Sequence, residues 1–180
     1  MRGRILAVVG PSGVGKDTVM AAVAARLPSV TLARRTITRP ETAGGEAFEG
    51  VTKPEFEDRL ARGSFALCWQ AHGLHYGIGL DQFAPAQAGG TVLFNGSRAA
   101  LAQAVATFPT LQVLHIIARP EVLAERLAGR GRESADQIAN RLSRRTAPFP
   151  DGVPVHEIDN SGRLEDAVSA ILVRLQPESV

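Results

Sequence analysis

Short apolar runs alternate with segments of helical periodicity along most of the chain. Residues 5–9 form a continuous apolar run that ends at Gly10, which predicts a strand buried on both faces. Apolar residues at helical spacing follow between 18 and 27. This order predicts an α/β fold with a parallel central sheet that helices cover on both faces. Further strands are expected at 30–33, 91–94, 111–118 and 155–158, and further helices at 97–107, 120–128, about 134–145 and 164–175.

A segment of about 35–90 interrupts this alternation. Its first part is polar and contains Pro40 and consecutive glycines, which are typical of a functional loop or a short irregular subdomain. We therefore expect one domain, 1–180, that carries the interrupting segment as an insert. Within the insert we expect, in order, the loop at 34–53, a helix at 54–62, and strands at 64–70 and 74–77.

The composition indicates a soluble globular protein. With 180 residues, 44% of them hydrophobic, the chain is long enough to bury a core, and its net charge of +2 argues against a nucleic-acid or membrane partner. Cys68 is the only cysteine, which excludes an internal disulfide and a thiolate zinc cluster. Because the first apolar run is too short for a signal peptide or a membrane span, we expect a cytoplasmic protein. The sequence leaves open whether the protein forms a homodimer.

A glycine-rich segment joins the first expected strand to the first expected helix. It reads Gly10-Pro11-Ser12-Gly13-Val14-Gly15-Lys16 and matches the P-loop pattern in the context that this motif requires. Glycines let successive backbone N–H groups point at one anion, and the helix N-terminus adds partial positive charge there. The motif predicts that ATP binds here and that Lys16 reaches its β- and γ-phosphates.

The residue after the lysine departs from the P-loop pattern. Asp17 stands where Ser or Thr normally meets Mg²⁺, and Thr18 follows one place later. Asn95 stands at the end of the strand that usually carries a metal-side aspartate. One hypothesis is that the metal-facing carboxylate has moved to Asp17, which would bind Mg²⁺ directly or through water. The alternative is that Asp17 is a first-turn helix residue favoured by the helix dipole.

Motifs spread over nearly the whole chain resemble those of the guanylate kinase superfamily. They are the P-loop with its following Asp17 and Thr18, the acceptor segment 36–40, the tyrosine–glycine element 73–77 and the arginine-rich segment 126–142. The resemblance implies the three-layer P-loop NTPase fold, ATP as the phosphoryl donor, and a lid at about 129–145. It also implies that Arg126, Arg130 and Arg141 act with Lys16 on the transferring phosphoryl group, and that Asn160 meets the adenine.

The base-reading site of guanylate kinases does not carry over to this chain. Leu67 stands where that family has a glutamate that reads guanine, and Arg35 stands where it has a small hydroxyl residue. Glu41-Thr42 replaces the second acceptor arginine, and only Phe48 stands near the place of the phosphate-binding tyrosine. Loss of the carboxylate partner would cost guanine specificity a factor on the order of 10² or more. We therefore expect an acceptor without a nucleobase.

Four separated segments resemble a narrower family, the ribose 1,5-bisphosphate phosphokinases of phosphonate degradation. They are GKD in the P-loop, ITRP at 37–40, WQAHGLHYG at 69–77 and NGSR at 95–98. The resemblance implies transfer of the γ-phosphoryl group of ATP to ribose 1,5-bisphosphate, which gives 5-phosphoribosyl 1-diphosphate. The alternatives are guanylate kinase itself, a kinase for another small acceptor such as gluconate, and an inactive binding module on the same fold.

Arginines lie where this phosphorylated sugar acceptor would bind. Arg34, Arg35 and Arg39 fall within six residues, and guanidinium groups match phosphate oxygens in pairs. Arg98 follows a strand at the carboxyl edge of the expected sheet, where open α/β sheets bind ligands, and we assign it to the acceptor. A phosphate acceptor is already ionised, so no general base is required. The other candidates are Glu46 and Asp81, either bound to sugar hydroxyls or exposed, and Tyr76 and Trp69, either walls of the site or packing of the insert.

Overall fold

A parallel five-stranded sheet forms the centre of the computed structural model, which describes residues 3–41, 47–129, 131, 134, 136–138 and 147–176. The strand order is β2-β7-β1-β8-β9, and each neighbouring pair is parallel. This confirms the predicted α/β class and the parallel central sheet. The strands are β1 Arg4–Val9, β2 Val30–Leu32, β7 Thr91–Asn95, β8 Gln112–Ile117 and β9 Val155–Asp159.

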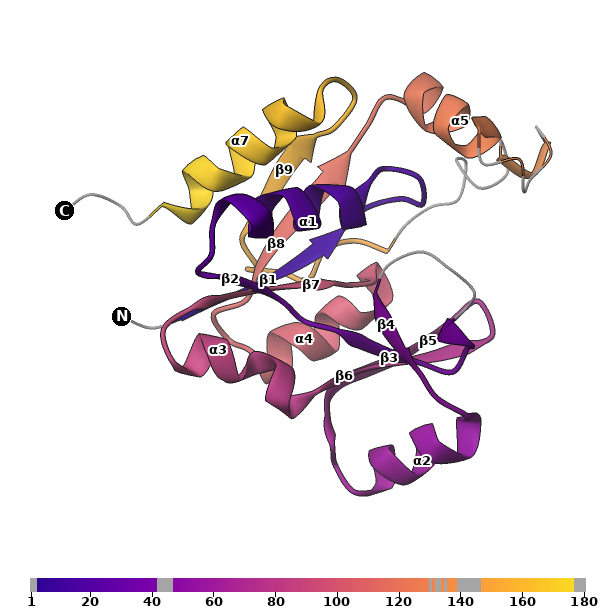
Figure 1. Cartoon of the computed structure of the whole chain (residues 1–180), viewed down its shortest axis with the longest axis vertical. Helices are drawn as coiled ribbons and strands as arrows, with labels where there is room; N and C mark the ends of the chain where they lie inside the picture. The colour runs from indigo at the N-terminus through magenta and orange to yellow at the C-terminus, as the bar shows by residue number, and fades with distance from the viewer. Residues whose placement is uncertain are drawn as a thin grey trace.

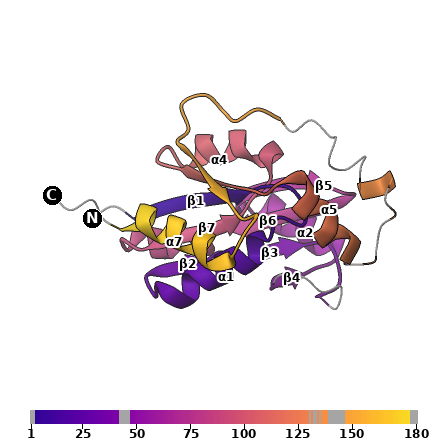
Figure 2. The ribbon, with the colours of Figure 1, turned by 90° about the horizontal axis from the view of Figure 1, so that it is seen from above.

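Helices cover both faces of this sheet (Figure 1). Figure 2 shows α4 on one side of the strands and α1 with α7 on the other. Because β1 is buried on both faces, Leu6 and Val8 enter the core beneath α1 and α7, whereas Ala7 and Val9 enter the core beneath α4. The helices are α1 Lys16–Arg26, α3 Ala84–Gln87, α4 Leu101–Thr107, α5 Pro120–Gly129 and α7 Leu164–Leu175.

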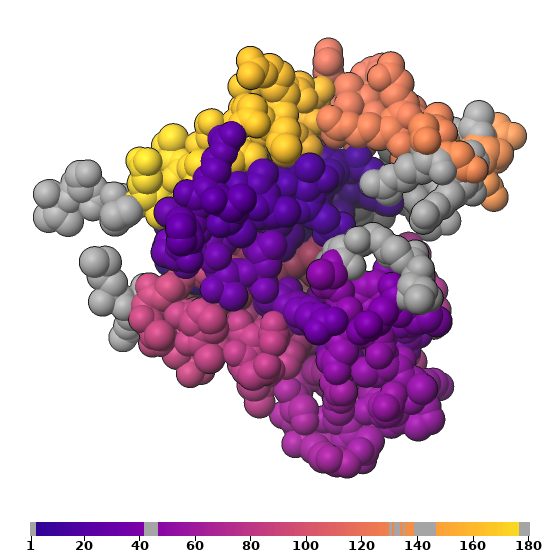
Figure 3. All heavy atoms as spheres, in the orientation of Figure 1, coloured from indigo at the N-terminus to yellow at the C-terminus, as the bar shows by residue number. Residues whose placement is uncertain are grey.

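The insert forms a second sheet of four strands, in the order β4-β3-β6-β5. β3 pairs in parallel with β4 and antiparallel with β6, and β5 pairs antiparallel with β6. Figure 3 shows this part of the chain as a lobe that projects from the rest of the molecule. The 3₁₀ turn η2 Leu80–Phe83 leads from the lobe back toward the main sheet. The strands are β3 Arg35–Ile37, β4 Phe48–Gly50, β5 Phe65–Ala71 and β6 Leu74–Gly79.

The prediction of a loop over 34–53 is wrong in part, because β3 and β4 lie within it. Each of these strands has only three residues, and β3 opens with Arg35 and Thr36, whose polarity hid the strand from the apolar pattern. Thr36 is nevertheless only 5% exposed. Its hydroxyl donates a hydrogen bond of 3.0 Å to Glu49 of β4, which explains how a polar residue tolerates a buried strand position.

The helices of the described residues are short, and none of them is long and apolar enough to cross a membrane. The helix predicted at 97–107 divides into the 3₁₀ turn η3 Arg98–Ala100 and α4. The helix predicted at about 134–145 lies largely outside the described residues. Its predicted cap is visible, because the Ser134 hydroxyl accepts a hydrogen bond of 3.3 Å from the backbone N–H of Gln137.

α2 Lys53–Ala61 covers one face of the insert sheet. A capping box fixes its first turn, because the side chains of Thr52 and Glu55 each accept a hydrogen bond from the other's backbone N–H. Phe56 is 1% exposed and stacks on Phe65 with ring centroids 4.7 Å apart. This ring pair anchors α2 on the sheet.

Replacing Phe56 with Ala should therefore lower the free energy of unfolding by about 3–5 kcal/mol, because the substitution leaves a cavity beneath α2. Urea unfolding followed by circular dichroism measures the change. Leu60 lies in the same helix and is 46% exposed, so Leu60→Ala serves as the control and should cost less than about 1 kcal/mol. Equal losses for the two variants would contradict the anchoring role of Phe56.

Candidate active site

The turn between β1 and α1 has the backbone of an anion-binding loop. Gly13 and Gly15 adopt φ values of 84° and 92°, in the left-handed region that favours glycine. A Cβ atom on Gly15 would also lie 2.8 Å from Nδ2 of Asn160, so the position has no room for a side chain. α1 begins at Lys16, and the N–H groups of its first turn add positive potential to the loop.

The ammonium group of Lys16 lies against this loop. Its Nζ donates hydrogen bonds to the carbonyl oxygens of Gly10, at 2.9 Å, and of Pro11, at 3.2 Å. The charge is therefore held at the loop that is predicted to bind phosphates.

Asn160 and Arg126 attach β9 and α5 to the same loop. Asn160, which is 5% exposed, donates from Nδ2 to the carbonyl oxygen of Val14 at 2.8 Å. Arg126 donates to that carbonyl at 3.3 Å and to the backbone carbonyl of Asn160 at 2.8 Å. The predicted adenine contact and one predicted phosphate-clamping arginine thus lie beside the P-loop. They line a cavity of about 420 Å³ together with Gly13, Gly15, Thr18, Gly162 and Leu164.

Asp17 and Asn95 are adjacent in space, although 78 residues separate them in the chain. The Asn95 side chain, at the end of β7, donates from Nδ2 to Oδ1 of Asp17 at 2.6 Å. The carboxylate is therefore oriented at the carboxyl edge of the main sheet, one residue after Lys16. The role of Asp17 toward a metal stays a prediction.

A single carboxylate oxygen donor fits Mg²⁺. Proteins commonly bind this ion through one or two carboxylates while nucleotide phosphates and waters complete the octahedron. Within the described ranges, no group of three or more His, Cys, Asp or Glu side chains could hold a metal ion. A metal at Asp17 would therefore depend on the nucleotide for further ligands.

Arg35 extends from the insert toward Asp17 and Asn95. It donates from one terminal nitrogen to the backbone carbonyl of Asn95 at 3.5 Å, and its guanidinium carbon lies 5.3 Å from the ring centroid of Tyr76. Burial lowers the pKa of Arg35, and the nearby charge of Asp17 opposes this shift. The guanidinium group thus places positive charge between the insert sheet and the P-loop.

The sheet face beneath Arg35 is aromatic and apolar. Tyr76 stacks on Trp69 with ring centroids 5.4 Å apart and an interplanar angle of 6°. Leu67 is 0% exposed and packs with Trp69 and Ile78 in the core between the two sheets. Hydrophobic packing therefore fills the position that the resemblance to guanylate kinases assigns to guanine reading. Tyr76 packs the insert and also contacts Arg35.

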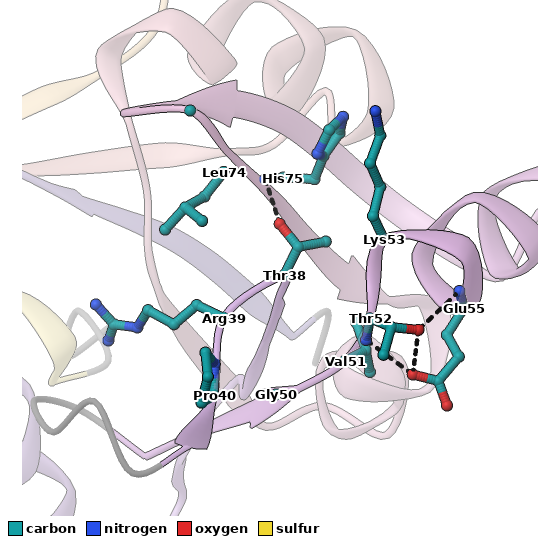
Figure 4. A pocket seen from close by; sticks show the side chains of 11 residues that line it. Thr38, Arg39, Pro40, Gly50, Val51, Thr52, Lys53, Glu55, Leu74 and His75 are labelled. Atoms are coloured by element: carbon teal, nitrogen blue, oxygen red, sulfur yellow. Dashed lines mark hydrogen bonds between the residues drawn. The ribbon is translucent and has the colours of Figure 1, made fainter.

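Arg39 borders a second cavity, of about 620 Å³, between the end of β3, the start of α2 and the β5–β6 hairpin (Figure 4). Its guanidinium carbon lies 4.4 Å from the ring centroid of Phe48. Sequence reasoning missed this contact, because it treated Phe48 only as a lost tyrosine. The aromatic character of Phe48, near the place of the family's tyrosine, could have predicted this contact. A phenyl ring can still pack against a guanidinium group. The cavity is also lined by Thr38, Pro40, Lys53, Leu74 and His75.

Arg98 has a different set of partners from the one that we predicted. It donates to the carbonyl oxygen of Ala147 at 2.8 Å, lies 3.1 Å from Nε2 of His115, and stacks over Phe149 at 3.6 Å. Burial lowers its pKa. These contacts hold Arg98 to the segment that leads into β9, and they compete with a role in binding the acceptor.

Of the remaining predicted residues, two are described by the structure and three are not. Arg34 is exposed, and donates to the carboxylate of Glu41 at 3.4 Å and to the carbonyl of Phe48 at 2.9 Å, so it ties β4 to β3. Asp81 accepts a hydrogen bond of 2.8 Å from its neighbour Gln82. The predicted site residues Glu46, Arg130 and Arg141 lie outside the described residues.

A phosphate-binding loop beside an arginine-bearing acceptor lobe defines a P-loop kinase of small molecules. A family model described as an AAA domain matches residues 5–148. The chain is 46% identical over 178 residues to the ribose 1,5-bisphosphate phosphokinase PhnN of Ruegeria sp. (strain TM1040), with 98% of this chain and 94% of the relative covered. It is also 46% identical to the PhnN of Agrobacterium fabrum (strain C58 / ATCC 33970), with 96% of each covered. The chain belongs to the ribose 1,5-bisphosphate phosphokinase family.

Solved structures agree with the fold. A guanylate kinase from Anaplasma phagocytophilum matches with a TM-score of 0.69 and 18% identity, and the match covers 96% of this chain and 84% of the other. A gluconokinase from Sinorhizobium meliloti 1021 matches with a TM-score of 0.51 and 20% identity, over 96% and 90% of the two chains. The guanylate kinase-like fold is thereby confirmed, and likeness at this level of identity concerns the fold alone.

Replacing Gly15 with Ala should weaken ATP binding about 5- to 30-fold, because a left-handed residue with a side chain is strained by roughly 1–2 kcal/mol and the new Cβ would displace Asn160. Titration calorimetry with ATP measures the change. Gly152 has a φ of 76°, and a Cβ atom there would meet no other atom within 4 Å, so Gly152→Ala imposes similar backbone strain away from the loop. Unchanged ATP affinity in Gly15→Ala, or an equal loss in Gly152→Ala, would contradict the expectation.

Proposed function

We propose that this protein is a cytoplasmic kinase that transfers the γ-phosphoryl group of ATP to the 1-phosphate of ribose 1,5-bisphosphate, giving 5-phosphoribosyl 1-diphosphate and ADP. Its family membership supports the reaction. Two structural observations together carry the choice of acceptor. Leu67 is buried, and the guanidinium group of Arg35 lies beside Asn95. Together they offer an anion site and no carboxylate for the N1–H and N2–H₂ donors of guanine.

The transfer needs positioning and charge neutralisation more than proton chemistry. An oxygen of the acceptor's 1-phosphate forms a bond to the γ-phosphorus, and the bond from that phosphorus to the bridging oxygen breaks as ADP leaves. The acceptor oxygen is already ionised, so no residue has to remove a proton. This accounts for a site whose proposed functional groups are mostly cations.

The geometry supports a separate proposed role for each group of site residues. The P-loop amides and Lys16 bind the β- and γ-phosphates, and Arg126 neutralises charge beside them. Asn160 and Arg126 also hold the loop in shape through the Val14 carbonyl. Asp17 would hold Mg²⁺, which when bound supplies further neutralisation of the phosphate oxygens. Arg35, Arg39 and Tyr76 form the acceptor side.

A side-by-side transfer assay tests the acceptor. With ribose 1,5-bisphosphate, GMP and gluconate as acceptors, only the first should give an efficient reaction, detected as 5-phosphoribosyl 1-diphosphate, and kcat/KM for GMP should be about 10²-fold lower or worse. Lys16→Ala is the inactive control and should lose transfer to every acceptor. Comparable turnover of GMP would refute the interpretation of Leu67 and Arg35.

Replacing Asp17 with Asn should raise the Mg²⁺ concentration that gives half-maximal rate by about tenfold or more, because at least ~1.4 kcal/mol of attraction for a divalent cation is lost. A Mg²⁺ titration at fixed ATP measures it. Asp166 is an exposed first-turn acid of α7, so Asp166→Asn is the control for losing a carboxylate at a helix N-terminus and should leave the titration unchanged. An unchanged titration in Asp17→Asn would remove Asp17 from the metal site.

A further inference from the structure

We propose that Glu49 is a positioning residue for the acceptor side of the site. Its carboxylate binds Arg59 of α2 and Thr36 of β3. These bonds fix the short strand β4, which carries the Phe48 ring beneath the guanidinium group of Arg39. The inference rests on the proposed function, because it takes Arg39 as a residue of the acceptor side. It assigns part of acceptor binding to a residue that acts through its neighbours.

The strand β4 has little backbone pairing of its own. It has three residues, and the described part of the insert sheet places it at the edge, beside β3 alone. A ladder of this length is marginal without other contacts. Side-chain bonds to neighbouring elements therefore decide where β4 lies.

Neighbouring residues of β4 point to opposite faces of the insert sheet. The register places Phe48 beside Arg35, on the face that approaches Asn95. It places Glu49 beside Thr36, on the face that α2 covers. Glu49 is thus directed away from the proposed acceptor and can affect it only through the position of the strand.

The carboxylate of Glu49 accepts three hydrogen bonds on the α2 face. The two terminal nitrogens of Arg59 each donate to a different carboxylate oxygen at 2.8 Å, which is the bidentate geometry that a guanidinium group favours. The Thr36 hydroxyl donates to one of these oxygens at 3.0 Å. The hydrogen bonds from Arg59 lower the pKa of Glu49, so the carboxylate stays charged at neutral pH.

This network does more than a surface ion pair, which contributes little by itself. The side chains of Glu49 and Arg59 are partly exposed, but Thr36 is buried, and its hydroxyl depends on Glu49 for a partner. Loss of the carboxylate would therefore remove a link to α2 and a link to β3 together. It would also leave a buried hydroxyl without this bond.

A displaced β4 would withdraw the ring that supports Arg39. Phe48 is buried, and its ring centroid lies 4.4 Å from the guanidinium carbon of Arg39. Without this support the arginine would have to be ordered when the acceptor binds, which weakens binding. The donor side is held separately, by the bond between Asn95 and Asp17. Acceptor binding should therefore respond to Glu49, and nucleotide binding should not.

Steady-state kinetics with ATP and ribose 1,5-bisphosphate test the inference. We expect Glu49→Ala to raise KM for ribose 1,5-bisphosphate by roughly tenfold, and to change kcat and KM for ATP by less than about threefold. If Glu49→Ala does not fold, Glu49→Gln keeps an acceptor for the Thr36 hydroxyl and should raise the same KM by about threefold. A residue that only stabilised the fold would lower the midpoint of thermal unfolding and leave both KM values unchanged.

Charge reversal separates the network from loss of a side chain. Glu49→Arg and Arg59→Glu each break the pair and should each raise KM for the acceptor. The double variant restores the pair with opposite sign, and the Thr36 hydroxyl can then accept a hydrogen bond in place of donating one. We expect the double variant to return this KM to within about threefold of the wild type.

A matched control comes from the same helix as Arg59. Asp58 forms an exposed ion pair with Arg62 of α2, so Asp58→Ala removes a paired carboxylate from the lobe and should leave both KM values unchanged. An unchanged acceptor KM in the folded Glu49 variants, an equal rise in both KM values, or a double variant no better than the single ones would overturn the inference alone. A wild type that does not convert ribose 1,5-bisphosphate would overturn the proposed function and this inference with it.

Discussion

The hydrogen bond between Asn95 and Asp17 is the contact on which the geometry of the site depends. It joins the end of β7 to the first turn of α1 and so fixes a carboxylate beside the P-loop lysine. The backbone carbonyl of the same Asn95 accepts a bond from Arg35, so one residue of the main sheet positions a negative group on one side and a positive group on the other. The donor and acceptor halves of the molecule meet at this residue.

Packing is the main physical difference between this chain and a guanylate kinase at the position expected to read the acceptor. Guanine recognition requires a polar group on β5, and here that position holds Leu67 in the core between the two sheets. A carboxylate at this position would bury an unpaired charge. The free-energy cost of that burial would favour opening of the core. The packing between the insert and the main sheet therefore supports the proposal of an acceptor without a nucleobase.

Much of the fold could be predicted because its signals are local. The P-loop, the buried β1 run and the strand–helix alternation all follow from neighbouring residues. The hydrogen bond between Asn95 and Asp17 was not predicted, because the sequence related these two residues only through a hypothesis about the metal. The strands β3 and β4 were missed because they are short, and because Thr36 is satisfied by Glu49 from another strand. The partners of Arg98 were missed for a similar reason, since Ala147 and Phe149 are about 50 residues away.

The choice of arginine for the acceptor side has a consequence for how the enzyme responds to acidity. Even with its pKa lowered by burial, a guanidinium group keeps its proton under all cellular conditions, whereas a histidine or a buried lysine would not. The charge that Arg35 presents is then constant with pH, whereas the phosphates of the proposed acceptor titrate. Because the second ionisation of a phosphate monoester falls near pH 6, the enzyme's rate on the acid side would report the protonation of its substrate.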